Sequence, residues 1–219
     1  MAVYRHKLIG ELREFYGPLL RQQANFASVH HHLEALANRM WEGVQDKNVA
    51  IYSEIANYHK EHLGRNIEVL KRLDLDLEAC RKTIAHEYGF RRWTEVTHQS
   101  QPYDLIFEHT IDAMLEGNTR DFRQNLIQHP FLTDRKSAYG HQATLLHYAV
   151  ANGVEMWRQQ VPLNLAESVE FLLERGINTQ AKMKVYGGEY RAAELLMSSA
   201  HPREAGLTGE LHRLLGNGD

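Results

Sequence analysis

The stretch GHQATLLHYAVANG at residues 140–153, together with ESVEFLLERGIN at residues 167–178, decides the fold expected for this chain. Apolar residues recur in both parts at helical spacing, and a glycine, Gly153 or Gly176, stands at each expected helix end. Glycine readily takes the positive φ that often ends a helix, and Thr144 is a residue type suited to begin one. The two parts therefore predict a pair of helices joined by a connection.

The same order of segments recurs on both sides of this pair. Residues 104–130 and residues 186–218 each contain a helical segment, a turn and a second helical segment. A unit of about 33 residues, with insertions in its later copies, accounts for the unequal distances between the three copies. The sequence therefore predicts about three helix–turn–helix repeats.

The first half of the chain also spaces its apolar residues as helices do. Tyr88-Gly89-Phe90 is expected to end a helix with Gly89 in the left-handed conformation. The polar stretch at residues 97–102 is the expected boundary between a first domain, 1–98, and a repeat domain, 104–219. The expected fold class is all-α, an N-terminal helical bundle followed by a short helical-repeat array. Its bundle helices are expected near residues 4–16, 19–45, 48–60, 64–72 and 76–88.

Composition narrows the classes of function. The chain has 219 residues and a formal net charge of −3, so no basic domain for nucleic acid is expected. No apolar run is long enough for a membrane span, and the first residues lack the apolar region of a signal peptide. The single cysteine, Cys80, cannot form an internal disulfide. We therefore expect a cytoplasmic protein without nucleic-acid or membrane partners.

Several motifs resemble those of ankyrin-repeat proteins. Thr144-Leu145-Leu146-His147, followed by small residues and Asn152-Gly153, is similar to the ankyrin signature. CRKTIAHEYGFRRWTEV at residues 80–96 resembles the segment before the repeats in a group of bacterial ankyrin-repeat proteins, which has the pattern IAxEYGFxxW. That group also carries YGG, here at 186–188, and SSAHPREAGL, here at 198–207, so the resemblance covers about 80–219.

The resemblance has two implications for structure and function. It implies that His147 bonds the backbone of a neighbouring hairpin and is structural. It also implies a non-enzymatic protein-interaction module of a bacterial cell, which binds a protein partner along a concave face. Because this is an analogy at the level of the fold, it identifies no particular partner.

The chain has 14 histidines, which raises the question of a metal site. Three consecutive histidines, His30 to His32, point in different directions on a helix and cannot converge on one ion. His59 and His62 share a helical face but have no carboxylate beside them in the usual order. Cys80 has no histidine at a spacing typical of a catalytic pair, and Ser198–His201 falls at a helix end, where such residues satisfy backbone groups. No metal, cofactor or catalytic residue is therefore expected.

The insertion VEMWRQQVPLNLA at residues 154–166 is the most informative departure from the repeat pattern. Trp157 and Arg158 are residue types typical of binding hot spots, and as exposed side chains they would contact the partner. The alternative is that Trp157 folds back over the core between repeats. The other expected contact residues lie on the hairpin tips: Tyr139, His141, Tyr186, Tyr190 and Arg191.

A second function stays open beside the protein-interaction module. The excess of histidine and the aromatic insertion also suit a small-molecule-binding protein or enzyme, with its site in the groove between the bundle and the repeats. An open face with scattered aromatic residues favours a protein partner. A concave pocket with converging polar groups favours a small molecule.

Overall fold

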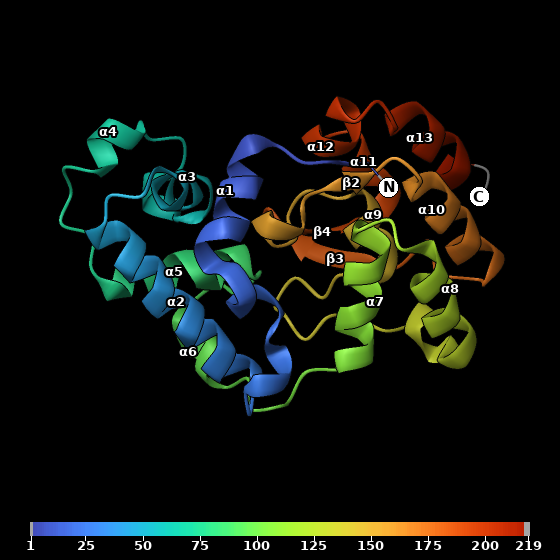
Figure 1. Ribbon diagram of the computed structural model, residues 1–219, viewed down its shortest axis with the longest axis horizontal. Coiled ribbons are helices and arrows are strands. Elements are labelled where there is room, and N and C mark those ends of the chain that lie inside the picture. Colours follow the sequence, from blue (N-terminus) through green and yellow to red (C-terminus); the bar gives the residue numbers. More distant parts are fainter. Residues whose placement is uncertain (1, 217–219) are drawn as a thin grey trace. The chain divides into compact units, whose positions relative to one another are not determined.

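The computed structural model describes residues 2–216 and is mostly helical, with 61% helix and 6% strand (Figure 1). This helical content confirms the all-α class. The chain divides into two compact units, Lys7–Tyr103 and a second unit made of Met1–His6 with Asp104–Asp219. Within the described part of the chain, no helix combines the length and the apolar character needed to cross a membrane.

The start of the chain belongs to the second unit, which differs from the expected first domain of 1–98. Strand β1 (Val3–Tyr4) pairs antiparallel with β2 (Val161–Pro162), which lies in the insertion. Arg5 strengthens this attachment, because its guanidinium donates to Gln160 Oε1 at 2.6 and 2.8 Å. A two-residue strand pairing of this kind leaves almost no pattern in the sequence.

The first unit, Lys7–Tyr103, is a bundle of helices around an apolar core. Helix α2 packs against α5, and α3 contacts both α1 and α5. Side chains such as Leu33, Met40 and Ile55 are completely buried between them. The helices of this unit are α1 (Lys7–Tyr16), α2 (Val29–Gln45), α3 (Val49–Tyr58), α4 (Ile67–Leu70), α5 (Leu77–Glu87) and α6 (Trp93–Thr97).

The expected single helix over 19–45 is wrong in its first third. Two short 3₁₀ helices, Gly17–Arg21 and Gln23–Asn25, precede α2. Helix α2 begins only at Val29, because Ser28 is its N-cap and accepts a hydrogen bond from the His31 N–H at 3.3 Å. A capping serine fixes where a helix starts, even where apolar spacing continues before it.

The end of α5 confirms the expectation for Gly89, whose φ is +77°. The N–H of Phe90 donates to the Ala85 carbonyl at 2.8 Å, and the N–H of Gly89 donates to that of His86 at 3.1 Å. These are the two hydrogen bonds of a Schellman motif, which satisfies the last carbonyls of a helix. Glycine takes this conformation without the steric cost that other residues bear.

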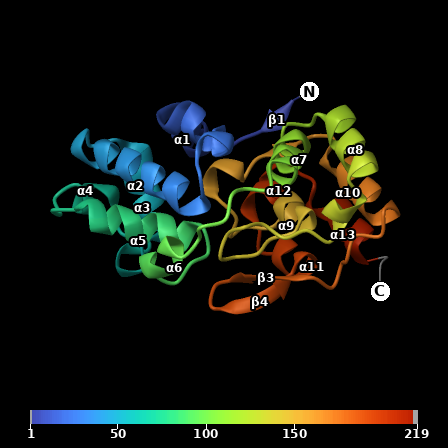
Figure 2. The ribbon, with the colours of Figure 1, turned by 90° about the horizontal axis from the view of Figure 1, so that it is seen from below.

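The second unit contains three consecutive helix pairs, arranged in two layers (Figures 1 and 2). Within the pairs, α7 contacts α8, α9 contacts α10 and α11 contacts α13. The first helices contact one another in one layer, and the second helices do so in the other, so one apolar core runs through all three pairs. The helices are α7 (Leu105–Leu115), α8 (Thr119–Gln128), α9 (Leu145–Val150), α10 (Leu165–Glu174), α11 (Ala192–Leu196), α12 (Ala200–Glu204) and α13 (Thr208–Gly216).

A β-hairpin precedes α11, with Tyr186 at its tip as expected. Strands β3 (Lys182–Val185) and β4 (Gly188–Arg191) pair antiparallel, with Val185 opposite Gly188. The Lys184 N–H donates to the His141 carbonyl at 2.8 Å, which places this hairpin beside the turn before α9. Figure 2 shows the hairpin at the edge of the helix layers.

We predict that Gly89→Ala lowers the free energy of unfolding by about 1 kcal/mol, because alanine is strained at positive φ. Gly209→Ala is the matched control. Gly209 lies inside α13, and an added Cβ there meets no atom within 4 Å, so this change is expected to raise stability by about 0.5–1 kcal/mol. Urea unfolding of both variants measures the difference, and a neutral Gly89→Ala would contradict the assignment of strain.

Candidate functional site

His147 connects the start of α9 to the β3–β4 hairpin. Its Nε2 lies 3.1 Å from the Tyr190 carbonyl, which only accepts, so the ring proton sits on Nε2. Its Nδ1 then accepts from the Thr144 hydroxyl at 2.8 Å and from the Thr144 N–H at 3.3 Å. This confirms the hydrogen bond to the hairpin backbone that was expected for His147. Burial lowers the pKa of His147 to about 4, so the ring is neutral near neutral pH.

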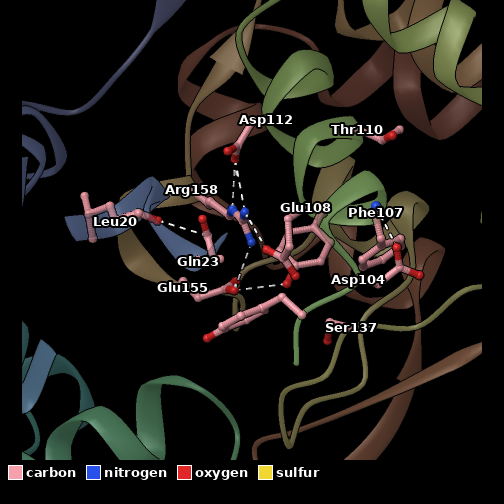
Figure 3. Close-up of polar contacts among 12 residues, drawn as sticks. Leu20, Gln23, Asp104, Phe107, Glu108, Thr110, Asp112, Ser137, Glu155 and Arg158 are labelled. Atoms are coloured by element: carbon pink, nitrogen blue, oxygen red, sulfur yellow. Dashed lines mark hydrogen bonds and ion pairs between the residues drawn. The ribbon is translucent and has the colours of Figure 1, made fainter. Parts of the chain in front are cut away.

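Arg158 lies at the centre of a buried charged network in the same unit (Figure 3). Its guanidinium donates to Glu108 Oε2 at 2.8 Å and to Asp112 Oδ1 at 3.1 and 3.2 Å, both on α7. It also contacts Glu155 Oε1 at 3.3 Å. Trp157 stacks over the guanidinium, with its ring centroid 4.5 Å away. The network therefore ties the insertion to the first helix of the array.

Two carboxyl groups of this network, those of Glu108 and Glu155, have pKa values shifted in opposite directions. Burial raises the pKa of Glu108 to about 7, against the opposing effect of Arg158. Burial also raises the pKa of Glu155, but Arg158 and His141 outweigh it, so this pKa lies below its usual value. Tyr148 additionally donates its hydroxyl to Glu155 at 3.0 Å. Glu155 is therefore the ionised partner, whereas Glu108 titrates near neutral pH.

Four of the residues expected to contact a partner are buried, so the prediction is wrong for them. Trp157 is 4% exposed and Arg158 is 1% exposed, so neither lies on a surface where a partner binds. The insertion folds back over the core, which was the alternative expectation for Trp157. Tyr139 and His141 are buried as well. His141 faces inward, because Nδ1 accepts from the Ala143 N–H and Nε2 lies 3.6 Å from Glu155.

The three remaining expected contact residues belong to the β3–β4 hairpin. Tyr186 is 69% exposed and Tyr190 is 37% exposed, whereas Arg191 is half-buried. Tyr186 and Gly187 have φ of +53° and +79° and form the two-residue loop, as in a type I′ turn. Asparagine or glycine is the usual first residue there, because a bulky side chain at positive φ is strained. An exposed tyrosine therefore occupies a strained position at the tip.

The residues considered for catalysis or metal binding are buried, bond the backbone or stack on one another. Cys80 is buried, and burial raises the pKa of its thiol to about 12, so it is no nucleophile at neutral pH. Ser199 donates to the Leu195 carbonyl at 2.8 Å, which is the backbone role expected at this helix end. His59 and His62 stack with their ring centroids 4.4 Å apart. Across residues 2–216, no three His, Cys, Asp or Glu side chains are placed to hold a metal ion.

One carboxyl pair lies inside the first unit, and sequence reasoning missed it. Glu54 on α3 and Glu87 on α5 are each 2% exposed, and the Tyr16 hydroxyl donates to Glu54 at 3.0 Å. Burial raises the pKa of Glu54 well above its usual value, and Glu87 adds to this effect. Burial and the neighbouring carboxyl thus both favour the protonated form of Glu54, and the cluster joins α1, α3 and α5. No local pattern marks residues that meet in this way.

We predict that Arg158→Met lowers the free energy of unfolding by about 3–5 kcal/mol, because it leaves buried carboxylates without their cation. Arg175→Met is the matched control, since Arg175 is an exposed C-cap residue of α10 and stacks on Phe171. Its loss is expected to stay below about 0.5 kcal/mol. Urea unfolding at neutral pH measures both, and equal losses would show that the network contributes nothing specific.

We predict that His147→Ala lowers the free energy of unfolding by about 1–3 kcal/mol at neutral pH, because buried partners lose their hydrogen bonds. The folded-state pKa of about 4 lies below the usual histidine value of about 6.5. The unfolded chain therefore binds more protons between these values, and the contribution of His147 is lost as pH falls through that window. Unfolding curves at several pH values should show the two proteins converging toward pH 4. A constant difference would contradict the buried neutral ring.

Comparison with known proteins adds no assignment to this geometry. No family model matches the chain, and no curated protein or solved structure matches it either. The resemblance to bacterial ankyrin-repeat proteins therefore rests on the motifs within residues 80–219 alone.

Proposed function

We propose that this chain is a non-enzymatic protein-interaction module and that the tip of its β3–β4 hairpin contacts the partner. The observation that carries the proposal is Tyr186, which is 69% exposed at φ +53°. An aromatic residue in this conformation costs about 1 kcal/mol or more, and most of this side chain stays exposed to solvent. Tyrosine is enriched at protein interfaces, where it supplies a large contact area. Contact with a partner would account for an exposed tyrosine in this strained conformation.

An ankyrin-like arrangement of the second unit is part of the proposal. Three helix pairs stacked in two layers, with a hairpin beside a turn on one side, are what such an array requires. His147 would then have the role that the ankyrin resemblance implies for it, since it bonds the hairpin backbone. In this arrangement the hairpin and the first helices form the concave face, along which the partner would bind.

The size of the cavity beside the hairpin favours a protein partner over a small molecule. This cavity has a volume of about 150 Å³ and is lined from α9, α11, α13 and the end of β4. Sites for drug-sized ligands commonly span about 300–1,000 Å³. A space of this size suits one side chain of a larger partner.

We predict that Tyr186→Asn raises the free energy of unfolding by up to about 1 kcal/mol, because asparagine tolerates positive φ. The same change is expected to abolish capture of the partner from a native bacterial lysate. Trp41→Asn, at an exposed position on α2 of the first unit, is the control for loss of an exposed aromatic side chain. Protein bound by the wild type and by Trp41→Asn, but not by Tyr186→Asn, supports the proposal. Equal capture by all three, or no specific capture by the wild type, refutes it.

A further inference from the structure

The cavity beside the hairpin is lined by two kinds of side chain. Leu146, Leu196 and Leu215 provide apolar walls from α9, α11 and α13. Gln180, Arg191 and His212 bring polar groups to the same space. A volume of about 150 Å³ is close to that of an engineered apolar cavity that binds benzene. One leucine-sized or aromatic side chain therefore fits, with polar groups beside it.

Positive charge gathers at the base of the hairpin, next to this cavity. Lys182 and Arg191 are directly opposite each other in the β3–β4 pairing, and like charges in this position are destabilising. Lys136 adds a third cation, because its Nζ donates to the Lys182 carbonyl at 3.1 Å. The hairpin therefore holds repelling cations in a unit where acidic side chains predominate, with 15 acidic against 11 basic in residues 101–219.

Internal carboxylates only partly neutralise these cations. Glu194 pairs with Arg191 at 3.2 Å, and Gln180 accepts from the same guanidinium at 2.9 Å. Among residues 2–216, no carboxylate lies within 4 Å of the Nζ of Lys136 or Lys182. An arginine has five N–H donors, so Arg191 keeps donors for a further acceptor. The base of the hairpin is therefore complementary to an anionic group.

We infer that this pocket receives an acidic peptide segment of the partner protein, with an apolar side chain in the cavity and a flanking carboxylate held by Arg191 and Lys182. The inference rests on the proposed function and names the chemistry of the partner. A carboxylate between Lys182 and Arg191 relieves their repulsion, and an apolar side chain removes the leucine walls of the cavity from water. The two contacts lie at the base of the hairpin that carries Tyr186 at its tip.

A nucleic acid is the other polyanion that this basic hairpin could attract. The acidic excess of residues 101–219 opposes a long polyanion, whereas a short peptide meets only the base of the hairpin. The cavity also has apolar walls for an aliphatic side chain. A peptide therefore fits both features, and an oligonucleotide serves as a competing probe.

The test measures fluorescence anisotropy of labelled peptides added to the whole chain. The probe is an Asp/Gly peptide with one central leucine, compared with a peptide that has asparagine for leucine and one that has lysine for aspartate. We expect the first probe to bind at least about tenfold more tightly than either companion, and to weaken with added salt. Equal binding of the three peptides, or tighter binding of single-stranded DNA, overturns the inference.

Variants locate the site on the hairpin. Lys182→Glu should weaken binding of the first probe about tenfold or more while leaving the melting temperature unchanged or higher, because it replaces a like-charge pair by an opposite one. Arg120→Glu, an exposed position on α8, is the matched charge control and should leave binding unchanged. Ala193→Leu fills the cavity and should remove the preference for leucine over asparagine, with folding checked by the melt. If Lys182→Glu binds the first probe as tightly as the wild type does, the proposed site is overturned.

The outcomes separate this inference from the proposed function. Capture of a protein that depends on Tyr186, together with no preference for acidic peptides, overturns the acidic partner and keeps the interaction module. If no protein is captured in a way that depends on Tyr186, the interaction module itself is overturned. Tyr186-dependent capture with leucine-selective, acidic binding that is lost in Lys182→Glu supports both.

Discussion

The burial of Arg158 is the constraint on which the second unit depends. A guanidinium that is 1% exposed is stable only where carboxylates surround it, and Glu108, Asp112 and Glu155 supply them. Because two of these lie on α7 and one lies in the insertion, the insertion is held against the first helix of the array. Its next residues then present β2, with which β1 pairs. The segment that departs most from the repeat pattern therefore holds the start of the chain and covers the core.

Local signals predicted much of the fold, and contacts between distant residues account for most of what they missed. Gly89 and His147 act through neighbours or through a motif whose geometry is known, so the sequence was sufficient for both. Arg158 pairs with carboxylates 46 and 50 positions away, and nothing in the insertion indicates whether a Trp-Arg pair faces a partner or a core. The start of α2 was missed for a simpler reason, because apolar spacing outweighed the capping signal of Ser28 in the prediction.

The candidate binding residues also divide into those that distant contacts bury and those whose exposure follows from a local turn. Trp157 and Arg158 were predicted from their residue type, and Tyr139 and His141 from an expected place on a hairpin tip. Tertiary contacts bury all four. Tyr186 remains exposed because it lies in the two-residue turn at the end of the hairpin, where few residues can cover it, and Tyr190 lies just after this turn on β4. Exposure at such a turn is predictable from a Tyr-Gly-Gly sequence. The positive φ of Tyr186 is what adds a functional indication, because it is a local cost that stability alone does not explain.

The raised pKa values of Glu108 and Glu54 belong to structural networks, because both carboxyl groups are buried. A carboxyl group with a pKa near 7 is suited to general base catalysis only where it can approach a substrate. Glu108 has such a pKa, but it is 2% exposed and its carboxylate is bound by Arg158. Glu54 is buried to the same extent. The hairpin, by contrast, exposes strained and repelling side chains above an interior that His147 holds in place. A rigid anchor beneath these exposed groups fits the proposed recognition of another protein, because preorganisation lowers the cost of binding.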